Sequence, residues 1–446
     1  MSSTTYKSEA SGLPRTIALD RSSVLMWAFV VVCLIYAAQV LTPLRLDHDS
    51  IVLLSMAASA SDGHGFLDHG SKTHYPPGYP AIVVGLERLG VARSWGFVGL
   101  NAISLFVGFA AAGYVALSYF SLSKNWAINV LLFTGLSFAV VKFFTIPQTD
   151  IVFFGMSLAA IALLVRAEDE RGSKYYVMWA AAVVISIAAF LVRTIGITLF
   201  VTLAWSMGQH LGVLEALRRL KRRQLIAAVA SLCSLVFVAL IVFQNAKYVR
   251  EAIAVFAKQG TNQSIRNFFL FRVHEIGELT LNVPASKLGP LASLVWVSGA
   301  IGIAILAFSV RRWKLGTVEV YLASYAFVMI LWPYCDPRFW IPVLPLAFAE
   351  LFSSLRPWEV IGWKRRIWLS YAIVYGLFGI AALGFSSRIT FSGRDFPSLS
   401  GTDNTENLLS TYKLFHWGKR DPDAGVNEAA LQLLQRYSST GAPGSQ

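Results

Sequence analysis

Residues 47–80 hold four aspartates and four of the chain's seven histidines, although apolar residues dominate the chain as a whole. The segment opens with Asp-His-Asp-Ser and closes with His-Tyr-Pro-Pro-Gly-Tyr-Pro. A carboxylate can take the proton of an attacking hydroxyl, and Asp with His can also bind a divalent metal. Because the segment directly follows the first apolar run, these residue types indicate a reaction or a binding event at a membrane surface.

Charged residues also stand at the ends of other apolar runs. A guanidinium group matches a phosphate through two parallel hydrogen bonds and stays charged at any working pH. We therefore interpret Arg193 and Arg338 as a phosphate-holding pair, with simple snorkelling to phospholipid headgroups as the alternative. Asp150 is interpreted as a residue that orients one of these arginines. For Asp336 we favour helix capping.

The composition indicates that membrane helices carry these residues. The chain has 446 residues, of which 55% are hydrophobic and only 14% charged, so a soluble protein of this size would lack the charges to cover its surface. Its apolar runs of roughly 17–25 residues are long enough to cross a bilayer. The fold class is therefore an all-α polytopic membrane protein. The net charge of +13 is explained by basic residues in short loops, which set the orientation of the spans in the membrane. We find no separate basic domain that would bind nucleic acid.

We predict about eleven spans, near residues 23–42, 95–118, 126–144, 150–166, 175–191, 194–210, 225–243, 291–310, 317–333, 338–355 and 367–386. The first is interpreted as a retained span rather than a cleaved signal. This divides the chain into a cytoplasmic segment 1–22, a transmembrane catalytic domain 23–386 with outer loops 43–94 and 244–290, and a polar extracytoplasmic tail 387–446. Within these we expect short helices at 81–90 and 426–437 and a disordered C-terminal end.

Basic residues in the short loops near 124, 166–174, 218–223, 311–314 and 356–366 place the N-terminus in the cytoplasm. With that orientation, six charged residues from distant parts of the sequence fall at the outer ends of spans. They are Asp47, Asp49, Asp150, Arg193, Asp336 and Arg338. This convergence indicates one extracytoplasmic site.

Several motifs carry a resemblance to a known family. The first loop has Asp-Ser at 49–50, Leu-Ser-x-Ala at 54–57, Gly-x-Gly-Phe at 63–66 and His-Tyr-Pro-Pro-Gly-Tyr-Pro at 74–80. Thr-Asp-Ile-Val-Phe-Phe begins at 149, Leu-Val-Arg-Thr-Ile-Gly at 191 and Asp-Pro-Arg-Phe-x-x-Pro-x-x-Pro at 336. Over residues 20–355 the chain resembles the GT-C glycosyltransferases, within them the branch of protein O-mannosyltransferases and aminoarabinose transferases.

The resemblance implies a polyprenyl-phosphate sugar donor on the outer membrane face and a first-loop acid that acts on the acceptor. Asp49 matches the family position and is the predicted base. Asp47 is a second candidate base, a metal ligand or a helix cap. The family's adjacent second acid is missing, since the acids flank His48, and aliphatic residues 51–53 replace the usual aromatic.

His74 fits the family position that lines the site. Asp47, His48 and His74 are candidate ligands if a divalent metal is used, although their spacing matches no metal motif and a structural or solvated role is favoured for the histidines. Tyr75 and Tyr79 are expected to pack the loop near the sugar or to anchor it at the interface.

These observations predict an integral membrane glycosyltransferase that moves a sugar, with inversion, from a polyprenyl-phosphate donor to a glycan, lipid or protein acceptor. An aspartate base and an arginine phosphate clamp would act on the outer face of a bacterial inner membrane. The alternative is a lipid or solute transporter or flippase, but the inverted repeats and mid-membrane polar residues typical of transporters are not found.

Overall fold

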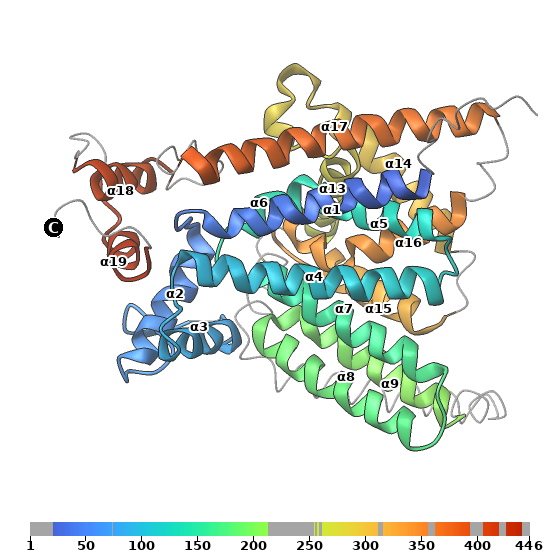
Figure 1. Ribbon diagram of the computed structural model, residues 1–446, viewed down its shortest axis with the longest axis horizontal. Coiled ribbons are helices and arrows are strands. Elements are labelled where there is room, and N and C mark those ends of the chain that lie inside the picture. The colour runs from blue at the N-terminus through green and yellow to red at the C-terminus, as the bar shows by residue number, and fades with distance from the viewer. Residues whose placement is uncertain are drawn as a thin grey trace, which may run out of the picture.

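The computed structural model describes residues 21–73, 75–212, 254, 257, 261–310, 315–355, 362–392, 405–418 and 425–438. The helices α1 (Arg21–Ala38), α4 (Ser94–Ser118) and α17 (Gly362–Ser392) run along the long axis of the molecule, and four shorter helices gather at one end (Figure 1). These four are α2 (His48–Ser61), α3 (Gly78–Arg88), α18 (Thr405–Trp417) and α19 (Glu428–Tyr437). The predicted all-helical membrane fold is confirmed.

In chain order, the remaining α-helices are α1 (Arg21–Ala38), α4 (Ser94–Ser118), α5 (Lys124–Gly135), α6 (Phe138–Phe144), α7 (Thr149–Glu168), α8 (Ser173–Val192), α9 (Ile197–His210), α13 (Thr261–Leu281), α14 (Leu294–Val310), α15 (Thr317–Ile330), α16 (Leu344–Leu355) and α17 (Gly362–Ser392). Short 3-10 helices are η1 (Gln39–Leu41), η2 (Thr194–Gly196), η4 (Ala285–Lys287), η5 (Gly289–Leu291) and η6 (Pro337–Val343). Strands β1 (Leu67–Asp68) and β2 (Ser71–Lys72) form a small antiparallel hairpin.

In the described part of the chain, six helices are long and apolar enough to span a bilayer. They are Ser23–Leu41, Ser94–Ser118, Thr149–Glu168, Ser173–Val192, Gly289–Val310 and Gly362–Phe391, and the bent pair α5–α6 would make a seventh. The protein is therefore an integral membrane protein. The count of eleven is not confirmed: α9 and α15 have 14 residues each, the predicted span 338–355 divides into η6 and α16, and span 225–243 lies outside the described residues.

Close contact between α4 and α7 builds the centre of the bundle. Gly155 of α7 lies directly against the carbonyl oxygen of Ser104, and Gly108 of α4 lies against the ring of Phe154, so neither position has room for a Cβ. Small residues of this kind let the backbones of membrane helices approach each other. The contact fixes α7, whose first turn carries Asp150.

The predicted span 126–144 is broken. α5 and α6 are bent by 56° at residues 136–137. The amide of Asn282, just after α13, donates to the carbonyl of Leu136 at 2.9 Å and accepts from the backbone N–H of Phe138 at 2.7 Å. A break in a membrane helix is tolerated where such groups satisfy the freed backbone.

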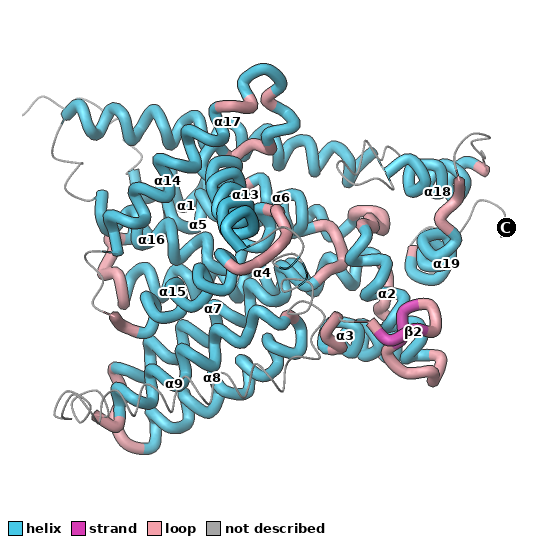
Figure 2. Tube along the Cα trace, turned by 180° about the vertical axis from the view of Figure 1, so that it is seen from behind, coloured by secondary structure: helices cyan, strands magenta, loops and turns pink. Residues whose placement is uncertain are grey.

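The first loop is helical, as predicted. α2, the hairpin and α3 lie beside α18 and α19 in both views (Figures 1 and 2). The helix expected at 81–90 is α3, which begins three residues earlier, and the helix expected at 426–437 is α19. The expected disordered end, from residue 439, lies outside the described residues.

Candidate active site

Asp47 caps the start of α2, the helix that carries Asp49. Its side chain accepts a hydrogen bond from the backbone N–H of Ser50 at 2.8 Å, and the Ser50 hydroxyl accepts from the N–H of Asp47 at 2.6 Å. This reciprocal capping box satisfies two backbone donors that the first helical turn leaves free. The capping role considered for Asp47 is therefore present. Asp49 lies in the same first turn, where the helix dipole favours a negative charge.

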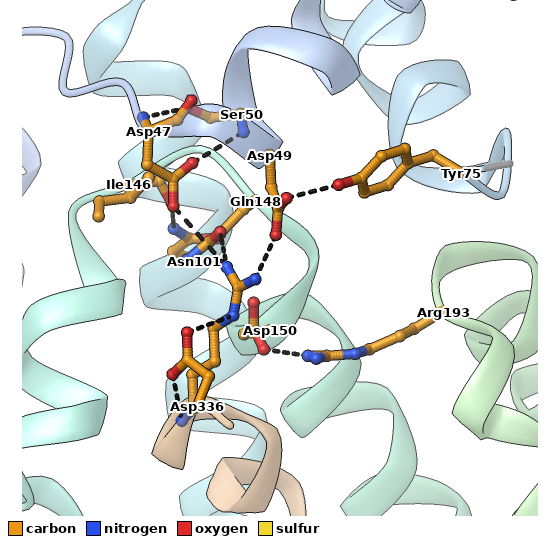
Figure 3. A network of polar contacts seen from close by, with 11 residues as sticks. Asp47, Asp49, Ser50, Tyr75, Asn101, Ile146, Gln148, Asp150, Arg193 and Asp336 are labelled. Atoms are coloured by element: carbon orange, nitrogen blue, oxygen red, sulfur yellow. Dashed lines mark hydrogen bonds and ion pairs between the residues drawn. The ribbon is translucent and has the colours of Figure 1, made fainter. Parts of the chain in front are cut away.

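Both carboxylate oxygens of Asp49 have partners (Figure 3). The hydroxyl of Tyr75, which lies between the hairpin and α3, donates to Oδ1 at 2.5 Å. Arg338 forms an ion pair and a hydrogen bond with Oδ2. The side chain is buried except for about a fifth of its surface, at 21% exposure, so the carboxylate lies at the edge of the protein interior.

Arg338 lies at the centre of the network. It belongs to η6, which Asp336 caps by accepting from the backbone N–H of Arg338 at 3.0 Å. The Nε atom of Arg338 also lies 3.1 Å from Oδ2 of Asp336. Its Nη1 atom lies 3.8 Å from Oδ2 of Asp47 and donates a hydrogen bond to Oε1 of Gln148 at 3.0 Å. Asp336 therefore both caps a helix and holds the guanidinium, and Arg338 contacts three carboxylates when Asp49 is included.

Arg193 and Asp150 form a second, adjacent pair (Figure 3). Arg193 stands in the extended break between α8 and η2, and Asp150 is buried in the first turn of α7. The Arg193 guanidinium carbon lies 5.0 Å from the ring centre of Phe339, and that of Arg338 lies 5.1 Å from the same ring. The aromatic ring thus joins the two ion-pair clusters through cation–π contacts. The structure brings the six predicted charged residues together; their chemical roles stay predictions.

The environments of the two first-loop aspartates differ. Burial raises the pKa of Asp47, and Arg338 offsets this only in part. Burial would also raise the pKa of Asp49, but the Arg338 charge and the hydrogen bonds from Tyr75 and Arg338 hold that pKa below its usual value. Fully ionised, four carboxylates and two guanidinium groups give the network a formal charge of −2.

The other predicted residues are placed less centrally. Tyr79 is completely buried in α3, and its hydroxyl has no hydrogen-bond partner among the described residues. His48 is exposed at the start of α2, and His74 lies outside the described residues. Within the described ranges, no group of three or more His, Cys, Asp or Glu side chains can hold a metal ion.

Two residues of the network were not predicted from the sequence. Gln148 contacts Arg338, and Asn101 of α4 donates to the carbonyls of Phe144 at 2.8 Å and Ile146 at 3.0 Å, which holds the turn before Gln148. A lone amide in an apolar span is costly unless it is paired, and that is the signal by which Asn101 could have been found.

A buried carboxylate supports Arg338 from the other side. Glu275 of α13 is fully buried and forms an ion pair with Arg272 at 3.1 Å. Its carboxylate accepts one hydrogen bond from the backbone N–H of Asp336 and one from the indole N–H of Trp340, both at 2.7 Å. Burial raises the pKa of Glu275 to about 7. Its two hydrogen bonds fix the residues on both sides of Arg338. The predicted outer loop 244–290 therefore contains a helix that packs against the site.

The fold of this chain is similar to that of two solved structures. ArnT from Cupriavidus metallidurans in the apo state is similar with a TM-score of 0.51 at 13% identity, and the match covers 94% of this chain and 86% of that chain. ArnT from the same organism bound to undecaprenyl phosphate matches with a TM-score of 0.49 at 14% identity, covering 95% of this chain and 86% of that chain. No family model matches the chain, and no curated protein matches it significantly. The chain therefore shares its overall fold with this apo ArnT structure, in agreement with the helical membrane fold that the resemblance implied.

Proposed function

We propose that this protein is a membrane glycosyltransferase that moves a sugar from a polyprenyl-phosphate donor to an acceptor hydroxyl on the outer face of a bacterial inner membrane. The observation that carries the proposal is the Asp49–Arg338 pair at the start of α2, where an ionised carboxylate lies against a guanidinium. The first group suits a base and the second a phosphate. The GT-C fold supports the same reaction class.

The proposed reaction needs a base and cations but hardly an acid, because the leaving group is already an anionic phosphate. The acceptor hydroxyl loses its proton to Asp49 while its oxygen attacks the anomeric carbon. The bond from that carbon to the phosphate oxygen breaks on the opposite side, so the configuration inverts. Arg338 and Arg193 stabilise the phosphate that leaves.

Donor binding must redistribute the contacts of Arg338. Its guanidinium is already paired with Asp47, Asp49 and Asp336. A donor phosphate that takes one edge of the guanidinium frees Oδ2 of Asp49, and that oxygen then accepts the proton. Arg338 thus couples occupation of the donor site to release of the base.

The test is transfer by purified protein in liposomes, with labelled polyprenyl-phosphate sugars and cell-envelope acceptors. Arg338→Lys keeps the charge but loses the planar, bidentate geometry. We expect it to lower the transfer rate by roughly 10²-fold or more. Arg388→Lys, an exposed position on α17, is the matched control.

Equal transfer rates in the two lysine variants would remove Arg338 from the phosphate-binding role. Movement of lipid or solute across the liposome membrane without any turnover of donor would instead favour the transporter alternative.

A further inference from the structure

One arginine of the C-terminal helix pair joins the far ends of both first-loop helices. Arg436 of α19 binds Asp62, the C-cap residue that directly follows α2, through two contacts of 3.0 and 3.1 Å. Its Nε donates to Oε1 of Glu87, in the last turn of α3, at 3.0 Å. The Ser61 hydroxyl also donates to Glu87. The bidentate geometry distinguishes this network from an ordinary surface ion pair.

The same helix pair holds the beginning of α2. The hydroxyl of Tyr412, a buried residue of α18, accepts from the backbone N–H of Leu46 at 2.8 Å and donates to the carbonyl of Leu44 at 3.2 Å. Leu46 directly precedes Asp47, the cap of α2. The helix that carries Asp49 is therefore held by the C-terminal pair at both of its ends.

The pair is itself fixed to the bundle. The backbone N–H of Asn427 donates to Oγ1 of Thr411 at 2.8 Å, which joins α19 to α18. The ring of Tyr437 meets Phe97 of α4 edge-on at 5.5 Å, and Arg93 donates to two carbonyls at the end of α19. Figures 1 and 2 both show α18 and α19 at the end of the molecule where α2 lies.

We infer that the α18–α19 pair is a positioning element of the active site, with Arg436 and Tyr412 as its positioning residues. The inference deepens the proposed function and rests on it. A helix held at only one end can tilt, and a tilt of α2 moves Asp49 relative to Tyr75 and Arg338. Since a misplacement of about 1 Å can cost roughly 10²-fold in rate, holding both ends contributes to the rate of proton transfer.

The experiment uses the full-length protein in nanodiscs. Arg436→Gln removes the bridge to Asp62 and Glu87, and Tyr412→Phe removes the hydroxyl while keeping the ring. Gln435→Ala, an exposed position next to Arg436, is the control. Hydrogen exchange of peptides that cover residues 44–62 reports on α2 without any assay of activity, and donor turnover reports on the reaction.

We expect both variants to speed exchange in α2 and to lower kcat by about tenfold, with KM for the donor unchanged and kcat partly restored by Arg436→Lys. Exchange equal to that of the control, or faster exchange with unchanged kcat, would overturn the inference. If the wild-type protein turns over no donor, the proposed function fails. Equal hydrogen exchange in the variants and the control counts only against the positioning role of the α18–α19 pair.

Discussion

At the residue scale, two carboxylates of the network both cap a helix and form an ion pair with Arg338. Asp47 caps α2 and Asp336 caps η6, yet both also face Arg338. Asp49 has no capping duty, and its lowered pKa keeps it ionised. This division of duties makes Asp49 the better candidate base of the two first-loop aspartates.

Glu275 leads to a prediction about stability and pH. Its pKa is about 7 in the folded protein, against an ordinary value of 4.5. The folded state therefore binds this proton more tightly, so the stability it contributes is complete below pH 4.5 and is lost as the pH rises to about 7. We expect the wild-type protein to lose up to about 3 kcal/mol over this range relative to Glu275→Gln, which cannot titrate. Thermal unfolding in detergent at about pH 5 and about pH 8 measures the difference.

The control for that comparison is Glu428→Gln, an exposed position on α19. A wild-type pH dependence identical to that of Glu275→Gln would show that this carboxyl group is not the one that titrates.

The sequence identified the charged residues of the site because acids and arginines are conspicuous at the ends of apolar runs. It did not identify Gln148 or Glu275. The contacts of these two residues arise only when α7, α13 and η6 meet in the folded protein. The pairing of Arg338 with Asp49 was also not predicted, because a phosphate clamp and a base were assigned separately.

At the element scale, apolar runs predicted the helices α4, α7, α8 and α14 to within three residues at each end, whereas α17 begins five residues before and ends six residues after its predicted span. It could not predict the break between α5 and α6, because the distant side chain of Asn282 satisfies the freed backbone there. Residues 175–210 form a nearly continuous apolar stretch in the sequence. The extended backbone of Arg193 interrupts this stretch and separates α8 from η2 and α9.

Helix packing gives a prediction at this scale. Replacing Gly155 with Ala places a Cβ against the carbonyl of Ser104, whereas Gly113→Ala on α4 meets only Leu131 at an ordinary 3.6 Å. We expect Gly155→Ala to lower the free energy of unfolding by about 1–3 kcal/mol. Gly113→Ala should be neutral or slightly stabilising, because alanine favours a helix by about 1 kcal/mol over glycine. Detergent-resistance melting curves compare them, and equal melting temperatures would contradict the close contact of α4 with α7.

At the scale of the whole molecule, the site lies at the end of the bundle where the first loop and the C-terminal helices meet (Figure 1). The basic short loops predict that this end faces outward. In a variant without Cys33, Cys233 and Cys335, we expect an impermeant maleimide to label Ser71→Cys in the hairpin on intact cells. Arg171→Cys, in the turn between α7 and α8, should react only after permeabilisation. The reverse pattern would place the site in the cytoplasm.

In the proposed reaction, Asp49 takes the proton of the acceptor. The direct measurement is the rate of sugar transfer from labelled polyprenyl-phosphate donor by Asp49→Asn and Asp47→Asn in the same liposomes. Asparagine caps a helix about as well as aspartate, so Asp47→Asn should keep α2 intact and retain transfer to within a few-fold. Asp49→Asn should lose about 10²–10⁴-fold in kcat with donor binding preserved. Full activity in Asp49→Asn, or loss of activity in Asp47→Asn alone, would contradict the role of Asp49 as the base.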